Sequence, residues 1–293
     1  HPESPARLKA VMEALDAPEF AGLERREAPR AARDALALVH PAPYLERIDT
    51  VFAEAEESGE RVRLDADTSV GPGSKEAALR AAGAAVAAVD AVLGGEAPHA
   101  FCAVRPPGHH AEPNRSMGFC IYSNAAIAGK YALDHHKLHR VAIVDFDVHH
   151  GNGTEAFCEA EEGLYYASTH QWPLYPGTGR PGVSGIAENV LNAAMPPGTG
   201  SREFREIMER RILPKVEKFQ PELLIISAGF DAHRDDPLAE CNLQDEDYGW
   251  ATEQLVGVAE RCCEGRVVSL LEGGYDLGAL SRCTAQHVRA LTA

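Results

Sequence analysis

The stretch VAIVDFDVHHGNGT, residues 141–154, determines how the rest of the chain is read. It predicts an apolar strand that ends in acidic and imidazole side chains. Because side chains alternate across a strand, Asp145, Asp147 and His149 are expected on one face, opposite the apolar residues between them. A carboxylate and an imidazole two residues apart suit a borderline cation such as zinc. The segment therefore predicts a metal site, although a strand fraying into a polar loop is the simpler alternative.

Further apolar runs alternate with longer helical patterns. AFCAV lies near residue 100, GLYYAS near 163, ELLIISAGF near 222 and VVSLLEGGY near 267. Helical patterns begin near residues 75 and 201, and most of the first sixty residues read as helix. Such alternation predicts a mostly parallel sheet with helices on both faces. We expect an α/β, doubly wound fold in a single domain, residues 1–293, because no linker-like segment interrupts the pattern.

Composition narrows the functional classes. Hydrophobic residues make up 45% and charged residues 25% of the 293-residue chain, as in globular proteins, and no segment predicts a membrane span. The net charge of -16 argues against nucleic-acid binding, which needs a basic face. Seven cysteines without a C-x-x-C pair indicate no disulfide framework and favour a cytoplasmic location. The chain shows no secretory signal, and its start at His1 rather than methionine indicates missing upstream residues.

Polar or glycine-rich residues follow the carboxyl end of each apolar run. They are RPPGHH, the Asp/His cluster, STHQ, FDAHRDDP and EGGYD. Ligands bind at the carboxyl edge of parallel sheets, so these clusters are expected to meet in one crevice. Asp231, after LLIISAGF, is the best third metal ligand, although an Asp at this position is also a common helix cap. Two carboxylates and one imidazole leave an open coordination position, which suits metal-assisted hydrolysis.

Hydrolysis also needs a proton carrier and a donor for the developing oxyanion. The adjacent pair His109 and His110 lies in a loop stiffened by two prolines and offers the proton carrier. Tyr275 follows two glycines, which let its loop approach closely, and its hydroxyl offers the oxyanion donor. A lone tyrosine is more often a packed surface residue, so Tyr275 gains weight only from the whole set.

These motifs resemble, in the same order, those of the zinc-dependent histone deacetylase family and its bacterial acetylpolyamine amidohydrolase relatives. The matching stretches are HPESPARL, ALVHPAPYL, RPPGHH, GFC, D-x-D-x-H-H-G-N-G-T, S-x-H with YPGTG, AGFD with DPL, and EGGYD. The resemblance covers essentially the whole chain and implies the arginase-deacetylase α/β fold. The GNGT variant is similar to the class II and bacterial branches.

The resemblance also implies roles for individual residues. Asp147, His149 and Asp231 would hold one zinc ion. His110 would act as general base and then acid, with His109 as its electrostatic partner, and Tyr275 would bind the carbonyl oxygen. Phe119 and Tyr175 would form the walls of a narrow tunnel, with Gly118 leaving room for the acyl group. Asp145 and Ser168 resemble a structural potassium site.

Asn152 stands where some branches of the family have an aspartate paired with the second histidine of the HH motif. An amide stabilises an imidazolium less than a carboxylate does, so we expect the pKa of His110 to be lower here than in the Asp-bearing branch. Asp145 would orient His109 in the same way.

Substrate choice is less well defined by the sequence. Leu238 matches a position at the tunnel mouth where an acidic residue marks the polyamine-selective branch, so leucine argues against strict polyamine selectivity. His233 and Arg234 are expected either to line the rim or to be an exposed, solvated pair. An acylated amine, such as an acetyl-lysine peptide or an acetylpolyamine, is the expected substrate, and the oligomeric state stays open.

Two alternatives compete with a zinc-dependent deacylase. An arginase-like ureohydrolase would need a two-manganese cluster with more carboxylate ligands, and the sequence offers no such further motif. A non-catalytic sensor that keeps the fold and the metal would be expected to have lost the general base or the tyrosine, and both are present. Ligand types do not separate zinc from ferrous iron.

Overall fold

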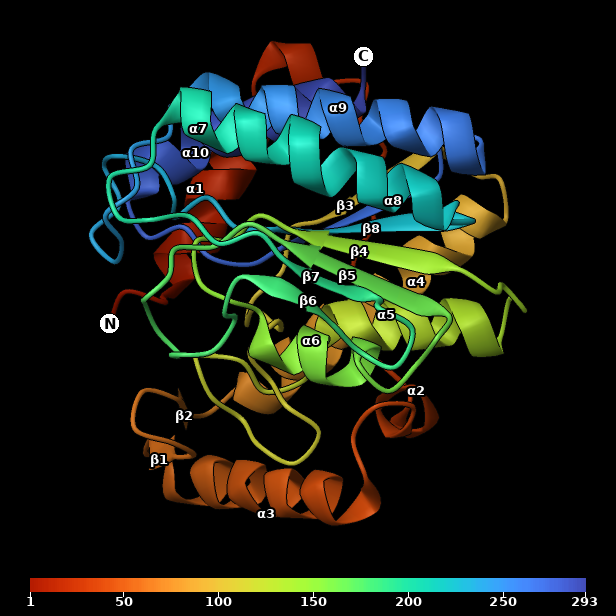
Figure 1. The fold of residues 1–293 in the computed structure, drawn as a ribbon. Coiled ribbons are helices and arrows are strands. Elements are labelled where there is room, and N and C mark those ends of the chain that lie inside the picture. Colours follow the sequence, from red (N-terminus) through yellow and green to blue (C-terminus); the bar gives the residue numbers. More distant parts are fainter.

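The computed structural model describes residues 1–293 and contains a seven-stranded sheet with helices on both faces (Figure 1). The strand order is β3-β9-β8-β4-β5-β7-β6, and all neighbours are parallel except β6 and β7. The strands are β3 (His99–Cys102), β4 (Val141–Asp145), β5 (Leu164–Ser168), β6 (Gly182–Ser184), β7 (Val190–Asn192), β8 (Leu223–Ala228) and β9 (Val267–Leu271). The α/β, doubly wound prediction is confirmed.

The helices form one layer on each side of the sheet, with a further layer beyond one of them (Figure 1). One face carries α1 (Pro5–Leu15), α7 (Ser201–Ile207), α8 (Leu213–Phe219), α9 (Asp245–Cys263) and α10 (Leu277–Leu291). The other carries α4 (Ser74–Leu93), α5 (Asn124–Asp134) and α6 (Asn152–Cys158), with α2 (Arg33–Ala37), α3 (Ala42–Ser58) and the hairpin of β1 (Val62–Arg63) and β2 (Ser69–Val70) outside them. A single 3₁₀ turn follows α1, at Pro18–Phe20.

Strand β4 lies at the centre of the sheet and divides two hydrophobic cores. Ala142 and Val144 pack with α9 and α10 on one face, while Val141 and Ile143 pack with α4 and α5 on the other. The apolar alternation continues past the strand, because Phe146 and Val148 also belong to the first core. The expected strand is shorter than predicted, since pairing with β5 and β8 ends at Asp145.

The helical pattern from residue 201 is not one uniform helix. A π-helical turn, Met208–Ile212, separates α7 from α8. Pro214 follows this turn, and because proline has no backbone N–H it cannot complete the regular α-helical hydrogen bonding there. None of the helices is both long enough and apolar enough to cross a membrane.

Candidate functional site

Asp147, His149 and Asp231 come together at the carboxyl edge of the sheet, as their positions after β4 and β8 predict. His149 Nδ1 lies 3.0 Å from Asp231 Oδ2 and 3.3 Å from Asp147 Oδ1. The three side chains are buried, and their ligand atoms all lie within 4.8 Å of one another. Two oxygens and one nitrogen at this spacing match the ligands of a divalent zinc site that keeps a position open.

The backbone around these carboxylates orients them. Val148 N–H donates to Asp231 Oδ1 at 2.9 Å, and Gly273 N–H donates to Asp147 Oδ2 at 2.8 Å. A side chain could not replace Gly273, because its Cβ would lie 2.2 Å from Asp231 Oδ2. The glycine therefore allows the chain after β9 to come against both carboxylates.

The two histidines of the RPPGHH loop lie side by side next to this cluster, with ring centroids 4.0 Å apart. Their Nδ1 atoms bond different partners. His109 Nδ1–H donates to Asp145 Oδ2 at 3.0 Å, and His110 Nδ1–H donates to Asn152 Oδ1 at 2.8 Å. Each bond leaves Nε2 as the free ring nitrogen, so the pair presents two unprotonated nitrogens on the opposite side of the rings.

The surroundings separate the two pKa values. Burial lowers the pKa of His109, but the charges of Asp147 and Asp145 outweigh this, so its pKa lies well above the usual value. Burial lowers the pKa of His110, and positive charge on His109 and His149 lowers it further. His110 is therefore the one that remains neutral and able to accept a proton near neutral pH.

Tyr275 and the aromatic residues lie around the same cluster. The ring of Phe119 meets that of Tyr275 edge-on at 5.9 Å, and the ring of Tyr175 meets that of His110 edge-on at 5.2 Å. Gly118 has φ +57°, and a Cβ there would lie 2.2 Å from His110 Cδ2. The approach to the histidine pair is thus bounded by aromatic rings on two sides and left open at the glycine.

Asp145 and Ser168 are cross-strand neighbours at the ends of β4 and β5. Asp145 Oδ2 accepts hydrogen bonds from His109 and from the Tyr166 hydroxyl, the latter at 3.1 Å. Ser168 bonds His170 Nδ1 at 2.8 Å. Asp145 therefore connects the histidine pair to the neighbouring strand.

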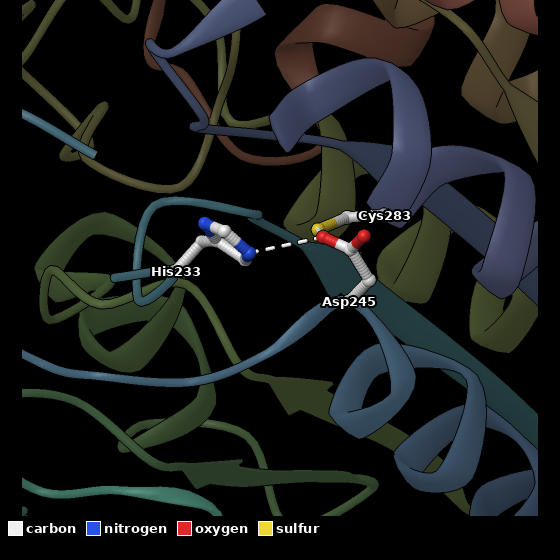
Figure 2. A group of neighbouring side chains, drawn as sticks. All are labelled: His233, Asp245 and Cys283. Atoms are coloured by element: carbon white, nitrogen blue, oxygen red, sulfur yellow. Dashed lines mark hydrogen bonds and ion pairs between the residues drawn. The ribbon is translucent and has the colours of Figure 1, made fainter. Parts of the chain in front are cut away.

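His233 and Arg234 differ from the expected rim or solvated pair. His233 is only 3% exposed, whereas Arg234 is exposed. Asp235 N–H donates to His233 Nδ1 at 3.1 Å, so the ring proton is on Nε2, which donates to Asp245 Oδ1 at 2.9 Å. Figure 2 shows this pair beside Cys283, whose sulfur lies 3.7 Å from the same oxygen. The contacts satisfy His233 fully and fasten the loop after Asp231 to the start of α9.

Leu238 is half-buried and belongs to the same loop. Its N–H donates to Asp236 Oδ1 at 2.9 Å, while Asp236 Oδ2 accepts from Tyr275 N–H at 2.7 Å. The sequence reading did not single out Asp236, although one carboxylate connects the loop of Leu238 to that of Tyr275.

Arg7 was also missed as a site residue. It lies on α1 and is fully buried; Nε donates to Gly274 O and Nη2 to Glu272 O, each at 2.6 Å. Its carbon Cζ lies 4.9 Å from the ring centroid of Tyr275. An arginine near the chain start gives no sequence signal of such a long-range contact, apart from its place in the HPESPARL match.

Comparisons with known proteins agree with this geometry. The family model described as "Histone deacetylase domain" matches residues 1–291. The histone deacetylase-like amidohydrolase of Pseudomonas aeruginosa is 40% identical, over 100% of this chain and 77% of its own length. The probable deacetylase of Archaeoglobus fulgidus is 38% identical, over 96% and 78%. The solved HDA15 HD domain superposes with a TM-score of 0.91 at 33% identity, covering 100% of this chain and 82% of that one. This chain belongs to the histone deacetylase family.

Proposed function

We propose that this member of the family is a zinc-dependent deacylase that releases acetyl or related acyl groups from an amine such as acetyl-lysine or an acetylated polyamine. The observation that carries the proposal is the convergence of Asp147, His149 and Asp231 beside the His109–His110 pair. The names of the Pseudomonas and Archaeoglobus relatives support amide hydrolysis. We further propose that residues 1–293 act as one catalytic domain and that Asp145 and Ser168 help to bind a structural potassium ion.

A zinc ion held by the three ligands would act as a Lewis acid toward the amide carbonyl and would lower the pKa of a water molecule. The side chains around it carry the proton. His110 Nε2 takes a proton from the attacking water and returns it to the amine nitrogen as the C–N bond breaks, giving a carboxylate and a free amine. His109 supplies a neighbouring charge, and the Tyr275 hydroxyl donates a hydrogen bond to the carbonyl oxygen.

The aromatic surroundings favour a slender acylated chain. Phe119 and Tyr175 would flank an alkyl stem, and Gly118 leaves space beside His110. The net charge of -16 suits a cationic amine or peptide. Leucine at position 238 offers no carboxylate to a polyamine, so acetyl-lysine is the preferred class.

Neither alternative is favoured by an observation. A ureohydrolase would need more carboxylates to hold a second ion, yet Asp145, the nearest candidate, is engaged by His109, by Tyr166 and by the N–H of Asp147 at 3.1 Å. A sensor without turnover would not need the neutral His110 or the tyrosine.

The test is an acetyl-lysine reporter assay on wild type and variants, with metal content measured on the same samples. His110→Ala and Tyr275→Phe are expected to abolish turnover with one zinc per chain retained, whereas Asp231→Ala is expected to lose both. Undiminished activity of His110→Ala and Tyr275→Phe would refute the assignment. A panel of acylated lysines and acetylpolyamines, ranked by kcat/KM, then identifies the substrate class.

A further inference from the structure

Glu272 is a fully buried carboxylate just after β9, three residues before Tyr275. Its Oε2 accepts two backbone hydrogen bonds from the histidine loop, from Gly108 N–H at 2.7 Å and from His109 N–H at 3.1 Å. Its Oε1 accepts from the Ser227 hydroxyl on β8 at 3.1 Å. Both oxygens of this carboxylate are therefore used within the protein, away from solvent.

The backbone of Glu272 is equally constrained. Its N–H donates to Ala228 O at 2.9 Å, and its carbonyl accepts from Arg7 Nη2. The next residue, Gly273, donates to the Asp147 carboxylate. Glu272 thus has a fixed position relative to the candidate metal ligands and to the tyrosine loop, and its side chain extends from that position to the histidine loop.

We propose that Glu272 is a positioning residue, which fixes the loop of His109 and His110 against the loop of Tyr275 by hydrogen bonds. The inference rests on the proposed function, because it concerns the groups that would move and receive the proton. It adds a connection between the two sides of the site, since the proton carrier and the oxyanion donor come from different segments and no direct bond joins their side chains. Catalysis falls steeply when such groups are misplaced by even about 1 Å.

The hydrogen bonds and the charge of Glu272 can be separated. A glutamine keeps one carbonyl oxygen for the N–H groups of Gly108 and His109, and its amide can donate to the Ser227 oxygen. Glu272→Gln therefore removes the charge while preserving the connection. Glu272→Ala removes both and leaves two buried N–H groups without their partner.

The experiment combines kinetics with amide hydrogen exchange at Gly108 and His109. For Glu272→Ala we expect kcat to fall about tenfold or more, KM to stay within about twofold, and exchange at these two amides to accelerate. For Glu272→Gln we expect kcat within about threefold of wild type and exchange close to wild type. Asn189→Ala is the matched control, because this buried side chain also makes three hydrogen bonds, to the carbonyls of residues 158, 161 and 164 near the opposite edge of the sheet. It should lose stability without a change in kcat.

Two results would overturn the proposal. One is a loss of kcat in Glu272→Gln as large as in Glu272→Ala, which would assign the effect to charge; this comparison with wild type also decides the matter if the alanine variant does not fold. The other is unchanged exchange at Gly108 and His109 in Glu272→Ala. A wild-type protein that leaves all acylated amines intact while Glu272→Ala still accelerates this exchange would refute the proposed function and retain the connection between the loops.

Discussion

The guanidinium of Arg7 lies over the ring of Tyr275, with carbon Cζ 4.9 Å from the ring centroid, and it donates to the carbonyl oxygens of Glu272 and Gly274. These residues are more than 260 positions apart in the chain. The first turns of α1 therefore support the tyrosine loop directly. Glu3 adds to this support, because it pairs with Arg7 and accepts two hydrogen bonds from Arg105, each at 2.6 Å.

Arg7→Ala is expected to lower kcat about tenfold and the free energy of unfolding by about 3 kcal/mol, because two buried carbonyls lose their donor. Chemical denaturation and the reporter assay measure the two effects. Lys9→Ala, an exposed position on the same helix with a 3.7 Å ion pair to Glu13, is the control and should change stability by less than about 0.5 kcal/mol. If Arg7→Ala keeps the wild-type kcat, the tyrosine loop does not depend on α1.

Gly118→Ala is expected to lower kcat about a hundredfold, because the new methyl group would lie 2.2 Å from His110 Cδ2 and would displace the imidazole. The control is Gly59→Ala at the end of α3, where φ is +70° and nothing lies within 4 Å of the added Cβ. Both variants carry the backbone strain of about 1 kcal/mol at positive φ, but only Gly118→Ala meets the histidine. Equal activity of the two variants would contradict this steric argument.

Asn152→Asp is expected to move the acidic limb of the kcat/KM profile to higher pH. Burial, together with positive charge on His109 and His149, holds the pKa of His110 well below its usual value. A carboxylate in place of the amide oxygen, 2.8 Å from Nδ1, would stabilise the imidazolium and raise that pKa. Because only neutral His110 accepts a proton, a higher pKa means that activity is lost at a higher pH.

The variant also needs a correction for its neighbour. Asn152 Nδ2 donates to Glu112 Oε1 at 2.7 Å, so Asn152→Asp alone brings two carboxylates together. The double variant Asn152→Asp with Glu112→Gln removes that repulsion, and it should show the same upward displacement of the acidic limb. An acidic limb that stays in place in both proteins would rule out the effect of the amide.

The sequence predicted the parts of the site that follow from strand order. Asp147, His149 and Asp231 meet because the carboxyl ends of parallel strands share one edge, and each follows an apolar run that is readily recognised. Their convergence therefore needed only the assignment of β4 and β8, not the details of packing.

The missed features depend on tertiary contacts. A glutamate in EGGYD and an arginine in PARL read as solvated charges, yet Glu272 and Arg7 are both fully buried by partners distant in sequence. His233 was likewise misread, because its partner Asp245 lies beyond the next loop. Strands β6 and β7 are three residues each, too short for a period-two pattern to stand out.

His287 provides a prediction that is independent of the site. It lies in the core between α10 and β9, where Nδ1 bonds Thr252 Oγ1 at 2.6 Å and Nε2 bonds Ser269 Oγ at 2.8 Å. Burial lowers the pKa of His287 to about 3. The folded protein keeps this ring neutral between about pH 3 and pH 6.5, whereas the unfolded chain takes up a proton, so the stability it contributes is lost as pH falls below about 6.5.

His287→Gln removes this titration. The variant is expected to be less stable than wild type at pH 8, and the difference should shrink by about 1.4 kcal/mol per pH unit below about pH 6. Urea unfolding of both proteins between pH 5 and pH 8 measures it. Burial also lowers the pKa values of His40 and His170 to about 4, but these groups titrate in both proteins and cancel in the difference. A difference that stays constant with pH would mean that His287 is protonated in the folded core.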